Sequence, residues 1–175
     1  MSRKEYMKTY LKRYHIQKRQ QVVDAYGGRC EVCGITELRF LTLDHSFQDG
    51  AEHRRRVGKD IYTDIIKRGF PKDEGYRVLC WNHNCAKQYS NKDTRQVRYR
   101  KKLKFKVVQH YGGKCACCGE DRLEFLTVDH KNGGGNKYRR NTKKNSSAFY
   151  SWLRREGYPL EYQVLCFNCN CGKEN

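Results

Sequence analysis

The segment GGKCACCGEDRLEFLTVDH, from Gly112 to His130, decides the fold that this sequence predicts. It begins with two glycines, contains a Cys-x-x-Cys pair formed by Cys115 and Cys118, and ends in the dipeptide Asp129-His130. Apolar and polar residues alternate from Phe125 to Val128, which is typical of a β-strand with one buried face. The segment therefore predicts a short strand that holds a carboxylate and an imidazole beside a cysteine pair.

An internal repeat extends this pattern over most of the chain. Cys30 is the counterpart of Cys115 at an offset of 85 (115 − 30), and Asp44-His45 is the counterpart of Asp129-His130 at the same offset. The offset grows to 86 between Cys80 and Cys166 (166 − 80). A period this long indicates a duplicated domain rather than a solenoid. We therefore expect two tandem modules of one kind, residues 1–92 and residues 93–175.

The composition favours a polyanionic partner and small cores. The 175 residues include 37 Lys+Arg against 19 Asp+Glu, a net charge of +18. This charge is clustered along the chain, which favours nucleic acid as the partner over a merely solubilising surface. Only 37% of the residues are hydrophobic, so two modules of this size need a further covalent or metal-based constraint to be stable.

The ten cysteines could supply that constraint. The sequence has no apolar N-terminal segment typical of a secretion signal and no stretch long enough to span a bilayer. We therefore expect a cytoplasmic protein without membrane contact. In a reducing compartment, paired Cys-x-x-Cys motifs indicate zinc sites rather than disulfides, which are the weaker alternative.

Each module contains four soft ligands in two pairs, the pattern of a closed, tetrahedral structural zinc site. In the second module the ligands are Cys115, Cys118, Cys166 and Cys169, and in the first they are Cys30, Cys33, Cys80 and His83. By spacing alone, Cys117 remains an alternative to Cys118. We expect two structural Zn²⁺ ions per chain.

The Asp-His pairs are the candidate catalytic residues. Asp129 and Asn170 can offer oxygen ligands to Mg²⁺, and His130 can act as a general base. The matching residues in the first module are Asp44, Asn84 and His45. Alone, such a pair would more simply hydrogen-bond a neighbouring loop. Its occurrence in both modules, each time with an Asn after the last zinc ligand, favours a phosphodiester-cleaving site with one Mg²⁺ per module.

Helical segments precede both modules. Residues 2–26 begin with a capping box and contain Tyr6, Tyr10 and Tyr14 among many basic residues. We expect either a basic helix along a phosphate backbone with its tyrosines packed on the first module, or a solvated helix that merely docks. Residues 92–106 predict an equivalent basic helix for the second module. Further helices are expected at residues 60–69, 85–91 and 147–156, further strands at residues 76–80 and 162–166, and a loop at residues 46–58.

Two longer runs resemble a known family. The run DHKNGGGNKYR, Asp129 to Arg139, is followed by Gly157-Tyr-Pro and then by YQVLCFNCN, Tyr162 to Asn170. Together they resemble phage HNH endonucleases, and most closely the zinc-bearing group that includes recombination endonuclease VII. The resemblance covers both modules and implies an α+β fold with a ββα-metal finger in each. It also implies that the Asp and Asn residues bind Mg²⁺ and that His45 and His130 are the bases.

The sequence departs from that family in two places. Glu161 and Gly75 stand near the position where many members have a structural Asn in the second strand. Relatives often have a His where the second module has Tyr138, whereas the first module keeps His53. The first module therefore has the more complete loop, and the second has the more usual zinc ligands.

These observations predict a metal-dependent DNA endonuclease. Two modules in one chain form a covalent pseudo-dimer, which as a monomer could cut both strands of double-stranded DNA with one active site per module. The arginine-rich segments at Arg54–Arg56 and at Arg139-Arg140 would bind phosphates without reading sequence. The alternatives are a branched-DNA (Holliday junction) resolvase and a non-catalytic zinc-stapled nucleic-acid-binding protein, and RNA remains open as a substrate.

Overall fold

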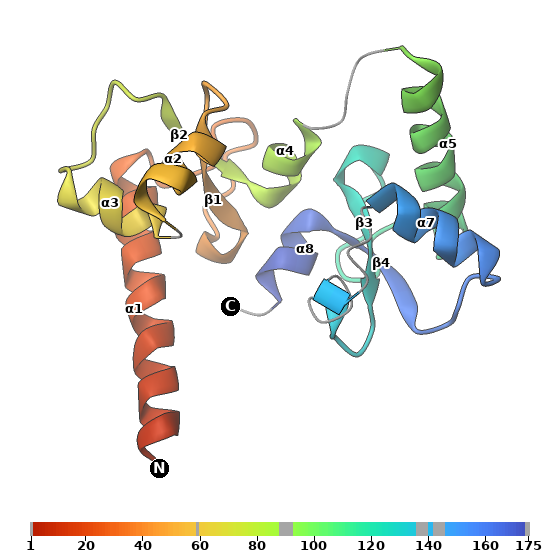
Figure 1. Cartoon of the computed structure of the whole chain (residues 1–175), viewed down its shortest axis with the longest axis horizontal. Helices are drawn as coiled ribbons and strands as arrows, with labels where there is room; N and C mark the ends of the chain where they lie inside the picture. Colours follow the sequence, from red (N-terminus) through yellow and green to blue (C-terminus); the bar gives the residue numbers. More distant parts are fainter. Residues whose placement is uncertain (1, 59, 88–92, 136–139, 142–145, 174–175) are drawn as a thin grey trace. The chain divides into compact units, whose positions relative to one another are not determined.

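The computed structural model describes residues 2–58, 60–87, 93–135, 140–141 and 146–173. The chain divides into two compact units, Met1–Cys80 and Trp81–Asn175. Each unit contains one two-stranded antiparallel sheet, formed in the first by β1 (Leu41–His45) and β2 (Tyr76–Cys80). The second sheet is formed by β3 (Leu126–His130) and β4 (Tyr162–Cys166) (Figure 1). The expected mixed α+β fold class is confirmed.

The helices of the first unit surround its sheet. They are α1 (Arg3–Ala25), the 3-10 turn η1 (Leu38–Phe40), α2 (Gly50–Val57) and α3 (Ile61–Lys67). The predicted capping box begins α1, because the Ser2 hydroxyl accepts from the Glu5 amide and the Glu5 carboxylate accepts from the Ser2 amide. Lys18 ties α1 to α3, since its Nζ donates to Asp60 Oδ2 at 2.5 Å and to Thr63 Oγ1 at 2.7 Å.

The second unit contains α4 (Trp81–Ala86), α5 (Arg95–His110), η2 (Leu123–Phe125), α7 (Ser146–Arg155) and α8 (Phe167–Gly172). From α5 to α8, its described elements follow the same order as those from α1 to α4. The turn η2 and strand β3 lie at an offset of 85 from η1 and β1, and β4 and α8 lie at an offset of 86 from β2 and α4. The repeat read from the sequence is therefore a repeat of structure.

The cores are small in both units. In the first, Val23, Leu41, Val78 and Leu79 pack with two of the cysteines. In the second, the core has two parts, one around Val107 and Leu153 and the other around Leu126 and Val164. The positions from the leading helices correspond, because Val22 and Val23 of α1 and Val107 and Val108 of α5 are all fully buried. Cores of this size agree with the need for metal-based stabilisation.

A reciprocal pair of hydrogen bonds joins α4 and α8 within the second unit. The amide of Asn82 donates to Asn168 Oδ1 at 3.0 Å, and the amide of Asn168 donates to Asn82 Oδ1 at 2.9 Å. Both side chains are buried, and the residues are equivalents in the repeat (168 − 82 = 86). The two helices therefore contact each other through the same residue on both sides.

Two local predictions were wrong, and one of the two alternatives for the N-terminal helix is excluded. The segment 46–58 is not a loop, because α2 occupies its second half, from Gly50 to Val57. The helix after the second strand begins at Trp81 rather than at Cys85, so it carries His83 and Asn84. The side chains of Tyr6, Tyr10 and Tyr14 do not pack on the first unit, since all three are exposed.

Candidate metal centres and hydrolytic site

Two clusters of metal-ligating side chains are present, and they consist of the predicted residues. One contains Cys30, Cys33, Cys80 and His83, and the other contains Cys115, Cys118, Cys166 and Cys169. Within each cluster, the ligand atoms all lie within 4.8 Å of one another. Both clusters could hold zinc.

The sulfur distances fit a tetrahedral ion. The Sγ atoms of Cys33 and Cys80 are 3.9 Å apart, and those of Cys118 and Cys166 are 3.7 Å apart. A tetrahedron with Zn–S bonds of about 2.3 Å has sulfur–sulfur edges of about 3.8 Å. A disulfide would require a separation of about 2.05 Å, and all ten cysteines are free thiols in the structure.

Tight turns present the first ligand pair of each cluster. The amide of Gly34 donates to the Cys30 carbonyl at 2.8 Å, and the amide of Gly119 donates to the Cys115 carbonyl at 3.0 Å. Both glycines have positive φ angles, 74° and 78°, which a glycine adopts without strain. The cluster contains Cys118 and not Cys117, although both side chains are exposed. This resolves the ambiguity that spacing alone left open.

The fourth ligand differs between the modules. It is Cys169 in one cluster and His83 in the other, each one helical turn after the cysteine that ends the strand. Burial, followed by the charge of Arg122, lowers the pKa of His83. This favours the neutral imidazole, the form that binds metal.

Strand register places each Asp-His pair against defined partners. In the first unit, Asp44 is opposite Arg77 and His45 is opposite Tyr76. Because side chains alternate along a strand, the carboxylate and the imidazole point to opposite faces. Asp44 is only 5% exposed, and its Oδ2 accepts from Arg77 Nε at 2.9 Å. In the first unit, β1 therefore carries a nearly buried carboxylate that is paired with a cation, and an imidazole on the opposite face.

In the second unit, the helix that carries Asn170 meets the strand that carries Asp129. Asp129 is 9% exposed, and its Oδ2 accepts from Lys173 Nζ at 2.5 Å. Asn170 lies three residues before Lys173, and residues at this helical spacing share a face. The predicted ligands Asp129 and Asn170 are thus placed on facing elements. In the first module, Asn84 lies on α4 in the second compact unit, whereas Asp44 and His45 lie in the first.

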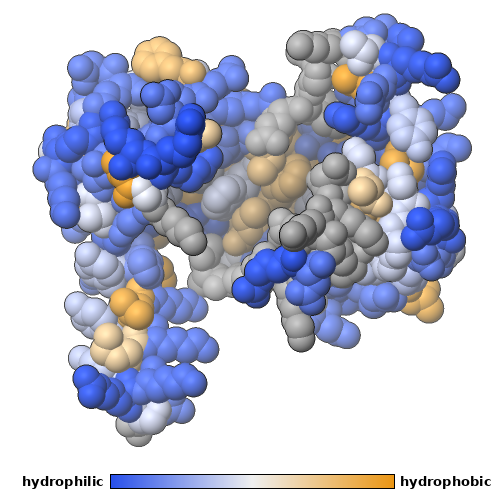
Figure 2. Space-filling model, viewed as in Figure 1, coloured by the Kyte–Doolittle hydropathy of each residue, from blue (hydrophilic) through white to orange (hydrophobic). Residues whose placement is uncertain are grey.

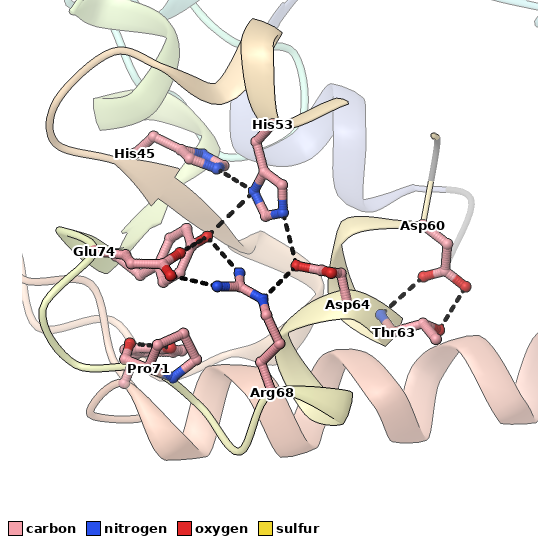
Figure 3. A network of polar contacts seen from close by, with 10 residues as sticks. His45, His53, Asp60, Thr63, Asp64, Arg68, Pro71 and Glu74 are labelled. Carbon is pink, nitrogen blue, oxygen red and sulfur yellow. Dashed lines mark hydrogen bonds and ion pairs between the residues drawn. The ribbon is translucent and has the colours of Figure 1, made fainter. Parts of the chain in front are cut away.

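A polar network surrounds His45 (Figure 3). His45 Nε2 lies 2.9 Å from His53 Nδ1, and His53 Nε2 lies 3.0 Å from Asp64 Oδ2. Arg68 Nε donates to the same Asp64 oxygen at 2.7 Å. Burial opposes ionisation of Asp64, but the hydrogen bonds from His53 and Arg68 outweigh it and lower the pKa of Asp64. The network runs from an ionised carboxylate through a buried imidazole to the candidate base.

The partners assign the ring nitrogens. The Asp64 carboxylate can only accept, so His53 Nε2 carries a proton. In the tautomer in which His53 Nδ1 accepts, both His45 Nε2 at 2.9 Å and the Tyr76 hydroxyl at 3.2 Å can donate to it. A proton on His45 Nε2 leaves the lone pair of the neutral His45 ring on Nδ1. Burial lowers the pKa of His45, which favours its neutral form. We therefore assign Nδ1 as the basic atom of His45.

A glycine borders that atom in both modules. A Cβ added at Gly50, the first residue of α2, would lie 2.9 Å from His45 Nδ1. A Cβ added at Gly135 would lie 3.2 Å from His130 Nδ1. The two glycines share the offset of 85 (135 − 50). In each case a side chain at the glycine position would contact the imidazole nitrogen.

The described neighbours of His130 include two aromatic rings. Its ring lies 4.7 Å from the ring of Tyr162, the residue opposite it in the sheet, and stacks with Phe149 at 6.2 Å between centroids. His45 has the matching tyrosine, Tyr76, at 5.0 Å. The two modules thus share the strand-borne histidine, the facing tyrosine and the glycine.

The predicted phosphate contacts are described in part. Arg54, Arg55 and Arg56 form the exposed last turn of α2, and Arg140 is also exposed. The expectations for Tyr138 and Arg139 lie outside the described residues. Within the described part of the chain, every helix is too short or too polar to cross a membrane.

Sequence reasoning missed two contributors to the site and underused a third. His53 was noted only as a loop residue, whereas Asp64 and Gly50 were not singled out. The shared offset of Gly50 and Gly135 was a readable signal, but nothing in the sequence pairs His53 with Asp64. Comparison with family models, with curated proteins and with solved structures found no match to this chain.

Proposed function

We propose that the protein is a metal-dependent DNA endonuclease built of two zinc-stapled HNH modules of the ββα-metal type, residues 1–92 and residues 93–175. The observation that carries the proposal is the twofold occurrence of one arrangement: a strand-borne Asp-His pair, a tyrosine facing the His, and a glycine at which a Cβ would contact its Nδ1. A hairpin followed by a helix with an Asn is the expected frame of such a site. The excess of positive charge supports DNA as the partner.

The second module supplies the clearer metal site. Asp129 and Asn170 would hold Mg²⁺, whose preference for few protein oxygens plus phosphate oxygens this donor set fits. When bound, Mg²⁺ would supply positive charge to the scissile phosphate and the leaving oxygen. His130 would take the proton of the attacking water as the general base. Asp44, Asn84 and His45 are the matching set of the first module.

The zinc clusters have a structural role in this proposal. Each has four protein ligands, so each is closed and offers no position for a water or a substrate. Each also joins the turn before the hairpin to the helix after it. Zinc would thus fix the orientation of α4 and α8 and, with them, Asn84 and Asn170.

Supercoiled plasmid tests the proposal, because nicking and linearisation give separate products. With Mg²⁺ the parent should produce linear DNA, and without added Mg²⁺ it should produce none. His45→Ala and His130→Ala should each stop at open circles nicked in opposite strands, and the double variant should bind without cutting. Loss of a general base slows a reaction by about 10²–10⁴-fold. Parental linearisation by His45→Ala would show that the first module does not cut.

Cleavage of branched DNA is the second candidate. It is favoured by the exposed tyrosines of α1, whose geometry suits unpaired bases rather than a continuous duplex. Four-way-junction DNA in the same assay separates the two candidates. A non-catalytic binder would leave both substrates intact under all metal conditions.

A further inference from the structure

The N-terminal part of α1 is not needed for the core. Every side chain from Ser2 to Gln17 is exposed, and the buried residues of α1 are Lys18, Val22 and Val23. The second unit provides an internal comparison, because α5 begins at Arg95, the equivalent of Tyr10 (95 − 85). Its buried residues occupy the corresponding positions of the repeat. About two turns of α1 therefore serve something other than packing.

The exposed part of α1, from Ser2 to Gln17, carries a row of three aromatic rings. Tyr6, Tyr10 and Tyr14 are 55%, 52% and 42% exposed. The centroids of Tyr6 and Tyr10 are 6.5 Å apart with ring planes 18° apart, and those of Tyr10 and Tyr14 are 6.3 Å apart with planes 4° apart. Lys18 Nζ lies 4.4 Å from the centroid of the Tyr14 ring and anchors the inner end. We name these three residues the tyrosine ladder.

Basic side chains accompany the ladder. Between Ser2 and Gln17, the basic residues are Arg3, Lys4, Lys8, Lys12 and Arg13, and the one acidic residue is Glu5. The Glu5 carboxylate is already engaged, since it accepts from the Ser2 amide at 2.7 Å. The ladder thus lies in a strongly positive field, which attracts polyanions and opposes pairing with a second copy of the same helix.

The ladder lies beside a row of lysines. Tyr6, Tyr10 and Tyr14 recur every fourth residue with Met7 and Leu11 on the same side of α1, and Lys4, Lys8 and Lys12 recur at the same spacing next to them. Figure 2 shows a few apolar side chains among hydrophilic ones on the part of α1 that extends toward the N-terminus. Aromatic rings beside cations are the pattern of single-stranded nucleic-acid binding, and a measurement with anionic vesicles distinguishes a membrane surface.

We propose that the tyrosine ladder is a stacking platform for unpaired bases of a DNA strand, with the adjacent lysines and arginines on its phosphates. The proposal rests on the proposed function and names its substrate class: DNA in which a single-stranded segment adjoins a duplex, as at a flap, a gap or a branch. The ring separations of 6.5 and 6.3 Å are close to twice the rise of about 3.4 Å per nucleotide. The ladder therefore matches every second base of a stacked strand.

Binding measurements without added Mg²⁺ test the ladder separately from catalysis. Fluorescence anisotropy of the zinc-loaded full chain would compare a labelled single strand, a duplex, and a duplex with a single-stranded flap. The test variant is Tyr6→Ala with Tyr10→Ala, because Tyr14 also contacts Lys18. Tyr6→Phe with Tyr10→Phe keeps the rings, and Met7→Ala with Leu11→Ala removes neighbouring apolar side chains of the same helix.

The alanine pair should weaken binding to the single strand and the flap by at least about tenfold, since each base–aromatic stack is worth about 5- to 150-fold. Duplex binding should change by less than about twofold, and the phenylalanine and Met7/Leu11 variants should bind all three DNAs like the parent. Parental flap affinity in the alanine pair would overturn the proposal. It would also be overturned if that pair lost binding to anionic vesicles, or self-association in sedimentation, with DNA binding intact.

Plasmid cleavage separates this proposal from the catalytic one. If the parent cuts no DNA with Mg²⁺ but the alanine pair loses flap binding, the endonuclease assignment fails and the ladder stands. If the parent cuts DNA and the alanine pair binds the flap normally, only the ladder fails.

Discussion

Replacement of Gly50 by alanine should greatly slow DNA cleavage by the first module without unfolding it. The added Cβ would lie 2.9 Å from His45 Nδ1 and 3.2 Å from its Cγ, closer than carbon and nitrogen atoms approach each other. Gly50 is the first residue of α2, and its φ angle lies outside the left-handed region, so alanine fits the backbone. Within helices, alanine is favoured over glycine by up to about 1 kcal/mol. The fold therefore tolerates the methyl group, and the imidazole must move.

The loss of cleavage activity in Gly50→Ala should approach the loss caused by removing the general base. A general base contributes about 10²–10⁴-fold, so we expect at least about 10²-fold slower cleavage of the first module's strand. Gly135→Ala should cost less, because its Cβ would lie 3.2 Å from His130 Nδ1, where a small shift relieves the contact. The structure thus predicts that Gly50→Ala slows cleavage more than Gly135→Ala does.

Single-turnover nicking with each strand labelled would measure both variants. Glu52→Ala is the matched control, because Glu52 is exposed on the same helix turn as Gly50. The thermal midpoint and the zinc content should equal those of the parent. Parental cleavage by Gly50→Ala, in a protein whose His45→Ala variant is inactive on that strand, would refute the assignment of Nδ1 as the basic atom.

Four further outcomes are expected. Asp64→Asn should slow first-module cleavage by up to about 10²-fold without changing DNA affinity, because the amide can donate as well as accept and His53 loses the acceptor-only partner that fixes its tautomer; unchanged single-turnover rates would contradict this. Cys118→Ser should halve the zinc content by elemental analysis and unfold the second module first. Lys173→Ala should lower the Mg²⁺ concentration that half-maximal cleavage requires, because the ammonium no longer competes for the carboxylate. Lys102→Ala with Lys106→Ala, both exposed, should flatten the salt dependence of DNA binding by about 1 to 2 in logarithmic slope.

Local spacing made the strands and the zinc ligands predictable. The alternation that ends in Asp129-His130 and the spacing within each cysteine pair are both encoded within a few residues. The two clusters and the register of both hairpins agree with that local information. Cys117 shows its limit, because spacing does not distinguish Cys117 from Cys118, and only the structure places Cys118 in the cluster.

Contacts between distant helices were not predictable. The link between His53 and Asp64 depends on how α2 and α3 pack, and no periodicity reports that packing. The tyrosines of α1 illustrate a different ambiguity. An aromatic residue at every fourth position looks the same whether the helix face is covered or exposed, so the sequence left both arrangements open, and in the structure the rings are exposed. The exposure of these rings was therefore known only from the structure, because the one indication of it is that α1 is longer than α5.

The reciprocal bonds of Asn82 and Asn168 have a consequence for how such a chain can evolve. A contact made by one residue with its own counterpart is isologous, the kind that identical subunits form about a twofold axis. Found between the repeated helices α4 and α8, it is the pattern expected of a fused homodimer. In a homodimer one sequence must form both halves, whereas after fusion each half can change its sequence independently. One half could then use His83 as a zinc ligand where the other uses a cysteine. The other half could likewise place Phe149 beside its histidine where the first has a polar side chain.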